Sequence, residues 1–135
     1  FRRLLEDGSQ WGINISYAIQ DKPLGLAHAF IIGEEFINGS PSALILGDNL
    51  FHGDDLVKKL KVISSDSEYS SVFAYPVNNP ESYGVINFNK QGSIESIEEK
   101  PLYPKSRYAM TGLYFFNSTV VDKAKLDEGL KNKLN

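Results

Sequence analysis

The stretch of residues 42–48, Ser-Ala-Leu-Ile-Leu-Gly-Asp, constrains the fold more than any other part of the sequence. It is a short, unbroken apolar run that ends in Gly47 and Asp48. Such a run predicts a strand that is buried on both faces, as in a parallel sheet.

Further predicted strands and helices lie on both sides of this run. The residue pattern predicts strands over 12–20, 71–77 and 108–116, helices over 26–37, after 54–55 and over 119–126, and a β-hairpin of 84–88 with 94–98. Ser118 is the predicted cap of the last helix. Buried strands that alternate with helices imply right-handed crossovers and an open, doubly wound sheet, to which the hairpin adds antiparallel pairs. The predicted fold class is therefore α/β with a mixed sheet, in a single domain over residues 1–135.

Composition excludes several classes of protein. Hydrophobic residues make up 41% and charged residues 23% of the chain, as in an ordinary globular domain. No apolar run approaches the roughly 18 residues that a membrane span needs. A net charge of -3 argues against a broad basic face for nucleic acid, and the absence of Cys fits a cytoplasmic protein.

Asp48 is the first candidate site residue. Ligands of open α/β sheets bind beyond the carboxyl ends of the strands, and Asp48 ends the most apolar strand. Its ordinary interpretation is a turn or capping residue in Gly-Asp-Asn. Its functional interpretation is a Mg²⁺ ligand, because this hard cation takes oxygen ligands and usually one or two carboxylates.

A second candidate is the loop that starts at Gln20 and contains Pro23 and Gly25. Pro and Gly are ordinary turn residues here. The amide of Gln20 offers an acceptor and a donor side by side, which complements the N–H and C=O edge of a pyrimidine base.

The third candidate is Glu98-Glu99-Lys100-Pro101, at the end of the predicted hairpin. Its ordinary interpretation is a solvated, charged strand end. In the functional interpretation, Lys100 contacts a phosphate and Glu99 a sugar hydroxyl.

The order of the motifs along the chain is more specific than any one of them. The motifs are Gln-x-x-Pro-x-Gly-Leu-Ala from Gln20, Leu-Gly-Asp-Asn from Leu46, Tyr-Gly-Val from Tyr83, Glu-Glu-Lys-Pro from Glu98 and Thr-Gly-Leu-Tyr from Thr111. With DGSQWG at 7–12 and FIIGEEFI at 30–37, this order strongly resembles the glucose-1-phosphate thymidylyltransferases over residues 1–121.

The resemblance implies a Rossmann-like, doubly wound sheet of the nucleotide-diphospho-sugar transferase type. It also implies a reaction in which glucose-1-phosphate attacks dTTP and gives dTDP-glucose and pyrophosphate. Asp48, as the Mg²⁺ ligand, and Lys100, on the sugar phosphate, would be catalytic. The other implied contacts are Gln20, Pro23 and Gly25 at the base, Gly84 and Glu99 on the sugar, and Thr111, Gly112 and Tyr114 along the sugar and phosphate.

One part of the family pattern does not occur in this sequence. The family has a first strand and a Gly-rich loop similar to Gly-Gly-x-Gly-Thr-Arg-Leu, and residues 8–12 do not replace it because they precede a strand. A second metal-binding Asp of the family is also absent. The fold is therefore expected to be incomplete at its N-terminus, and the chain alone is expected to turn over weakly or not at all.

Two further expectations follow from this departure. Missing strands leave apolar sheet edges, which predicts a homo-oligomer or a complementary segment. The alternative function is a catalytically silent sugar-nucleotide-binding or assembly module on the same fold. A relative specific for another nucleotide also remains open, because Gln20 can pair with uracil as well as thymine.

Overall fold

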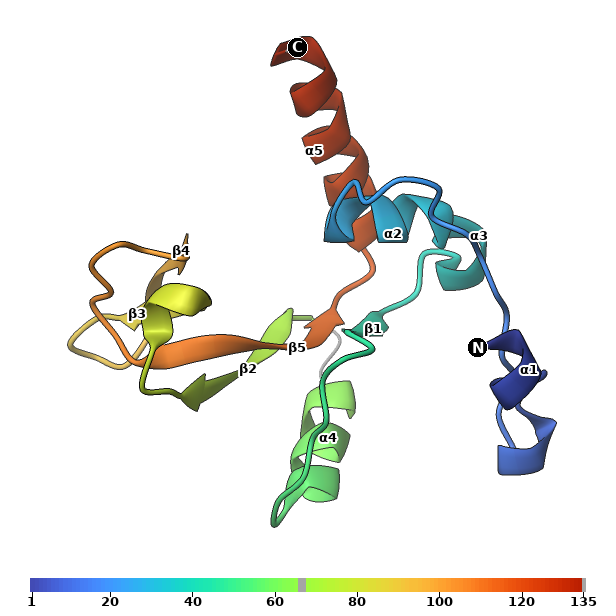
Figure 1. The fold of residues 1–135 in the computed structure, drawn as a ribbon, viewed down its shortest axis with the longest axis horizontal. Coiled ribbons are helices and arrows are strands. Elements are labelled where there is room, and N and C mark those ends of the chain that lie inside the picture. Colours follow the sequence, from blue (N-terminus) through green and yellow to red (C-terminus); the bar gives the residue numbers. More distant parts are fainter. Residues whose placement is uncertain (66–67, 135) are drawn as a thin grey trace. The chain divides into compact units, whose positions relative to one another are not determined.

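The computed structural model describes residues 1–65 and 68–134. It divides into two compact units, which Figure 1 shows in one view without fixing their relative positions. The first unit comprises Phe1–Gly39 and Val120–Asn135, and the second comprises Ser40–Thr119. The prediction of a single domain stays a prediction.

The second unit is built around one long strand. Its strands are β1 (Ser42–Ile45), β2 (Ser71–Pro76), β3 (Gly84–Phe88), β4 (Ile94–Glu99) and β5 (Tyr108–Phe116), and helix α4 (Leu56–Ser65) lies between β1 and β2 in the chain. In β5, Tyr114 pairs with both Leu44 of β1 and Val72 of β2. A strand has two edges, so β1 and β2 lie on opposite edges of β5.

The hairpin of β3 and β4 confirms its prediction. Ile86 pairs with Ile97, and Gly84 pairs with Glu99. In the turn, the side-chain Oδ1 of Asn89 accepts hydrogen bonds from the backbone N–H groups of Gln91 and Ser93. Gly92 adopts φ +81°, in the left-handed region where glycine meets no steric penalty.

The core of the second unit lies along β3 and β5. Val85 pairs with Ala109, and both are buried. Ile86, Leu113 and Tyr114 are also buried. These apolar side chains supply most of the driving force for folding this unit.

The α/β class is confirmed, but two expectations drawn from the apolar run at 42–48 are wrong. The described strand pairings are all antiparallel, because β5 lies between β1 and β2. The strand is also not buried on both faces: Ile45 is 57% exposed, and Ala43 on the same face is exposed. An apolar run is buried on both faces only where two layers cover it, and no described element of the second unit covers this face.

The first unit is helical. It contains α1 (Arg2–Leu5), a 3₁₀ turn (Ser9–Trp11), α2 (Leu26–Ile32), α3 (Glu34–Ile37) and α5 (Val120–Leu134). Helix α2 packs against α5, with Phe30 and Ala124 buried. The helix predicted over 26–37 is two helices, because the chain breaks at Gly33, a poor helix former.

The cap of α5 also differs from its prediction. The helix starts at Val120, which puts Ser118 too early to cap it. Asn117 fills a related role, since its Oδ1 accepts hydrogen bonds from the N–H and hydroxyl of Thr119.

Residues 12–20 differ most from their predicted structure. The alternating pattern predicts a strand, yet the structure assigns none to this segment. A strand is stabilised by its ladder, and none of the described strands pairs with residues 12–20. Two apolar members of the pattern are left in solvent, with Ile13 55% and Ile19 75% exposed.

Within the described ranges, we find no helix that combines the length and the apolar character needed to cross a bilayer.

Candidate functional site

Gly84 and Glu99 form the first part of the candidate site, where the hairpin begins and ends. The two residues are register partners. A Cβ atom at position 84 would lie 3.1 Å from Glu99 Oε2 and 3.3 Å from Met110 Cε. Glycine at this position therefore allows the Glu99 carboxylate and the Met110 side chain to approach the β3 backbone closely.

Lys100 follows Glu99 in an unusual backbone conformation. Its φ is +45°, in the left-handed region that residues with a Cβ rarely adopt. Its backbone N–H donates to the carbonyl of Tyr83 over 3.0 Å, which holds this turn against the start of β3. Strained backbone of this kind costs about 1–3 kcal/mol and clusters at functional sites.

Tyr114 is linked to Glu99 electrostatically. The side chain of Tyr114 is only 8% exposed. Burial, and secondarily the negative charge of Glu99, raise the pKa of the Tyr114 phenol above its usual value of 10.0. The hydroxyl therefore stays protonated at neutral pH and can donate a hydrogen bond.

We expect Tyr114→Phe to weaken the loss of stability at high pH. A raised pKa means that the folded chain holds the Tyr114 proton more tightly than the unfolded chain. The contribution of Tyr114 to the free energy of unfolding is therefore full below pH 10.0 and is lost as pH rises. Urea unfolding between about pH 9 and about pH 11 measures the effect. Tyr103→Phe, which removes an exposed phenol, is the control; an equal effect of both substitutions would contradict the prediction.

Asp48 and Asn49 form the second part of the site, in the turn after β1. The Asn49 side chain donates from Nδ2 to Asp48 Oδ1 over 2.8 Å. Its Oδ1 accepts the backbone N–H of Gly112, in β5, over 3.1 Å. Asn49 thus bridges a β5 backbone amide and the exposed carboxylate of Asp48.

The surroundings of Asp48 fit Mg²⁺ as a weakly held ion. Among the described residues, no group of three or more His, Cys, Asp or Glu side chains is arranged to hold a metal. Mg²⁺ commonly takes only one or two carboxylates and completes its shell with water and substrate phosphate. Asp48, with one oxygen held by Asn49 and its side chain in solvent, can supply one such carboxylate.

Thr111 lies in a β-bulge of β5. The register of β2 and β5 shifts between Val72 and Ala74, which leaves the Phe73 carbonyl opposite the bulge. The Thr111 hydroxyl donates to this carbonyl over 2.9 Å. In this structure the side chain therefore satisfies a backbone group of the sheet.

The predicted base-binding residues lie in the first unit. The Gln20 amide Nε2 donates to the carbonyl of Gly25 over 3.2 Å and lies 3.1 Å from Nδ1 of His28. Gly25 has φ +92° and precedes α2, and Pro23 is exposed in the same loop. The loop is held closed by Gln20 itself.

The structure therefore gathers the predicted residues into two groups. The first group meets β5 at two neighbouring residues. Met110 lies beside Gly84 and Glu99, and Gly112 bonds to Asn49, the neighbour of Asp48. Two residues of strand span about 7 Å. Gln20, Pro23 and Gly25 lie in the other unit, so their convergence with Asp48 and Lys100 stays a prediction.

Three residues of these groups were not predicted from the sequence. Asn49, Met110 and His28 each contact a predicted residue. Asn49 lies within the Leu-Gly-Asp-Asn motif, so its position was a usable signal. Met110 and His28 carry no local signal, because their roles depend on contacts made in the fold.

This fold and this order of motifs are those of a nucleotidyl transferase. The chain belongs to the nucleotidyl transferase family, whose family model matches residues 1–134. Among curated relatives, it is 53% identical to the glucose-1-phosphate thymidylyltransferase of Neisseria meningitidis serogroup A, over 93% of this chain and 43% of the relative. It is 50% identical to that of Mycobacterium tuberculosis, over 97% of this chain and 44% of the relative. The chain thus spans less than half the length of these relatives.

Solved structures give the same family. A Bacillus anthracis protein described as a glucose-1-phosphate thymidylyltransferase, in complex with sucrose, superposes with a TM-score of 0.81 and 36% identity, over 90% of this chain and 48% of that one. A UDP-glucose pyrophosphorylase complexed with UDP-glucose has a TM-score of 0.73 and 25% identity, over 92% of this chain and 52% of that one.

Proposed function

We propose that this chain carries the sugar-phosphate half of a glucose-1-phosphate thymidylyltransferase active site. The enzyme would join dTTP and glucose-1-phosphate to give dTDP-glucose and pyrophosphate. The observation that carries this proposal is that the Gly84–Glu99 pair and the Asp48–Asn49 turn meet β5 at neighbouring residues, Met110 and Gly112, with Lys100 directly after Glu99. The names of its relatives support the reaction.

The chemistry proposed for this site is positioning and charge neutralisation. A phosphate oxygen of glucose-1-phosphate attacks the α-phosphorus of dTTP and pyrophosphate leaves, which needs no covalent protein intermediate. Lys100 would hold the sugar phosphate, Glu99 would accept a hydrogen bond from a sugar hydroxyl, and the backbone of Gly84 would contact the sugar ring. Mg²⁺, when bound at Asp48, supplies positive charge to the phosphate oxygens.

The remaining roles are proposed for residues beside this group. Tyr114 would donate from its protonated hydroxyl, and Gly112 and Thr111 would shape the wall of the site through the β5 backbone. In the first unit, Gln20 would pair with thymine beside Pro23 and Gly25, once its amide leaves Gly25 and His28. The proposed location is the cytoplasm, where the absence of Cys is unremarkable.

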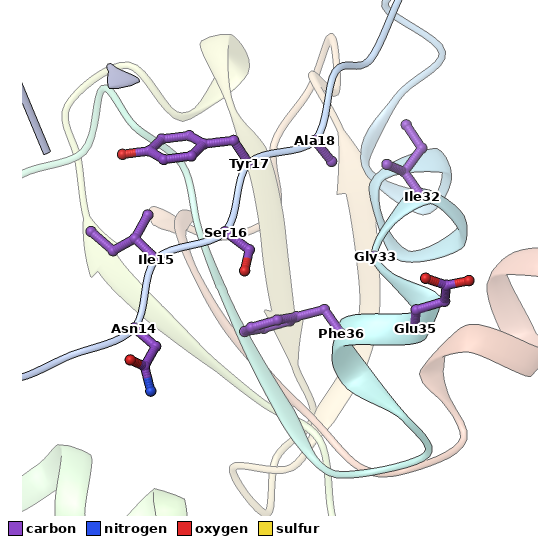
Figure 2. A pocket seen from close by; sticks show the side chains of 9 residues that line it. All are labelled: Asn14, Ile15, Ser16, Tyr17, Ala18, Ile32, Gly33, Glu35 and Phe36. Carbon is purple, nitrogen blue, oxygen red and sulfur yellow. The ribbon is translucent and has the colours of Figure 1, made fainter. Parts of the chain in front are cut away.

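We also propose that residues 12–20 pair with a strand from a complementary segment or a second copy. Beside this segment is an open groove of about 650 Å³, between residues 14–18 and the ends of α2 and α3. Figure 2 shows the Phe36 ring reaching from α3 toward residues 14–16. Phe36 is 77% exposed, and an added apolar strand would cover such a surface.

A hybrid enzyme tests the proposed function. The chain replaces the matching residues of the Neisseria meningitidis relative, and pyrophosphate release is measured with dTTP, glucose-1-phosphate and Mg²⁺. We expect turnover by the hybrid enzyme, and weak turnover or none by the chain alone. The chain alone offers the phosphates a single Lys, Lys100, and a single metal-binding carboxylate, Asp48. Light scattering of the chain mixed with the relative's remaining segment measures the pairing directly.

The controls separate the two proposed functions. Asp48→Asn in the hybrid enzyme is expected to lower turnover by about 10²-fold or more, the size of effect seen when a charge-stabilising group is removed. A folded hybrid that binds glucose-1-phosphate but releases no pyrophosphate would instead support the catalytically silent module.

A further inference from the structure

Asn49 and Gly112 form a clasp between the turn after β1 and strand β5. Asn49 donates to Asp48 and accepts from Gly112, as described above. The backbone adds two more bonds, since Leu46 N–H donates to the Gly112 carbonyl over 2.8 Å and Asn49 N–H donates to the Leu46 carbonyl over 3.1 Å. The turn after β1 is therefore bonded to both the N–H and the carbonyl of Gly112 in β5.

The clasp leaves no room for a side chain at position 112. A Cβ atom there would lie 2.7 Å from Asn49 Nδ2 and 2.9 Å from Leu46 Cβ. Gly112 is buried, and its φ lies outside the left-handed region. The glycine is thus needed for space and not for its backbone conformation.

We infer that Asn49 and Gly112 are positioning residues that set the orientation of the Asp48 carboxylate for a divalent cation. This inference rests on the proposed function. The Asn49 amide holds Oδ1 of Asp48, which restricts rotation of the carboxylate and leaves its second oxygen for a cation. Groups that orient a metal-binding carboxylate in this way commonly change metal affinity by about 10- to 100-fold when they are removed.

The test uses Mn²⁺ as the probe and the isotope-labelled chain. Paramagnetic broadening of the backbone amide signals of residues 47–49 and 112 is followed during a Mn²⁺ titration. We expect the Mn²⁺ concentration that gives half-maximal broadening to rise about tenfold in Asn49→Ala and in Gly112→Ala. Gly112→Ala breaks the clasp without changing either side chain in the turn.

The chain offers a matched control for the added methyl group. Gly47 is adjacent to Asp48, yet a Cβ atom at position 47 would meet nothing within 4 Å. Gly47→Ala is therefore expected to leave the broadening unchanged. Protection of the Gly112 amide from hydrogen exchange provides a metal-free reading, because it is expected to fall in Asn49→Ala and to persist in Gly47→Ala.

The outcomes distinguish this inference from the proposed function. Broadening that survives Asp48→Asn would remove the metal role of Asp48, and with it this part of the proposed function. Broadening lost in Asp48→Asn but unchanged in both Asn49→Ala and Gly112→Ala would overturn the positioning role alone. Amide spectra of each variant establish that it is folded, and Glu95→Gln, an exposed change on β4, controls for unspecific Mn²⁺ binding.

Discussion

Lys100→Ala in the hybrid enzyme is expected to lower kcat/KM for glucose-1-phosphate by roughly 10- to 100-fold. The reason is the loss of one charged hydrogen bond to phosphate, which contributes about 1.5–3 kcal/mol, where about 1.4 kcal/mol is a factor of ten. Lys100 is exposed at the end of β4, and its backbone is fixed by the bond to Tyr83, so its amine extends from a defined point. Steady-state pyrophosphate release at varied glucose-1-phosphate measures the effect.

Lys105→Ala is the matched control for charge. Lys105 is five residues further along, its side chain is 75% exposed, and its described ion pair is with Glu98 at 3.9 Å. Surface pairs of this kind contribute little, so kcat/KM is expected to stay within about twofold.

Lys100→Gly separates the amine from the backbone. Glycine relieves any strain at φ +45° but also removes the charge. We expect Lys100→Gly to be as impaired as Lys100→Ala. Activity restored by glycine would show that position 100 matters for its backbone alone.

The parts of the fold that the sequence predicted well are those whose partners lie nearby in the chain. The hairpin of β3 and β4 is one example, because its two short strands and the Asn89–Gly92 turn that joins them are neighbours in the chain. The long strand β5 is another, since its aromatic and β-branched residues favour a strand in any pairing.

The wrong predictions concern properties that depend on other parts of the molecule. The alternation in residues 12–20 indicates a strand, but no described strand pairs with it. The apolar run at 42–48 indicates burial, but Ile45 is exposed because no described layer of the second unit covers it. In both cases the residue pattern indicates a conformation or burial that needs a second element. The described structure lacks that element. Residues 12–20 also mark the surface where the proposed partner strand would bind.

The candidate site divides in the same way. Asp48, Glu99 and Lys100 were identified because their motifs are contiguous in the sequence. The clasp was missed because Asn49 and Gly112 are 63 residues apart, and a glycine that leaves space for a distant side chain has no local signature. The hydrogen bond from the Thr111 hydroxyl to the Phe73 carbonyl was not predicted for the same reason. It crosses a β-bulge that has no signature in the sequence.

Ile86→Ala is expected to produce the largest loss of stability, about 2–5 kcal/mol, because deleting buried methyl groups leaves a cavity. Ile86 is only 1% exposed at the junction of β3 and β5. Its register partner Ile97 is 50% exposed, so Ile97→Ala is a matched control with an expected loss of about 1 kcal/mol. The free energy of unfolding is measured in urea by circular dichroism.

The same variant tests how the two units unfold. The single Trp of the chain, Trp11, lies in the first unit, whereas Ile86 lies in the second. If the units unfold independently, Ile86→Ala shifts the circular dichroism transition and leaves the Trp11 fluorescence transition in place. We expect this result, because each unit has its own buried contacts, α2 against α5 in one and β3 against β5 in the other. Coincident shifts in both signals would instead support one cooperative domain over the whole chain.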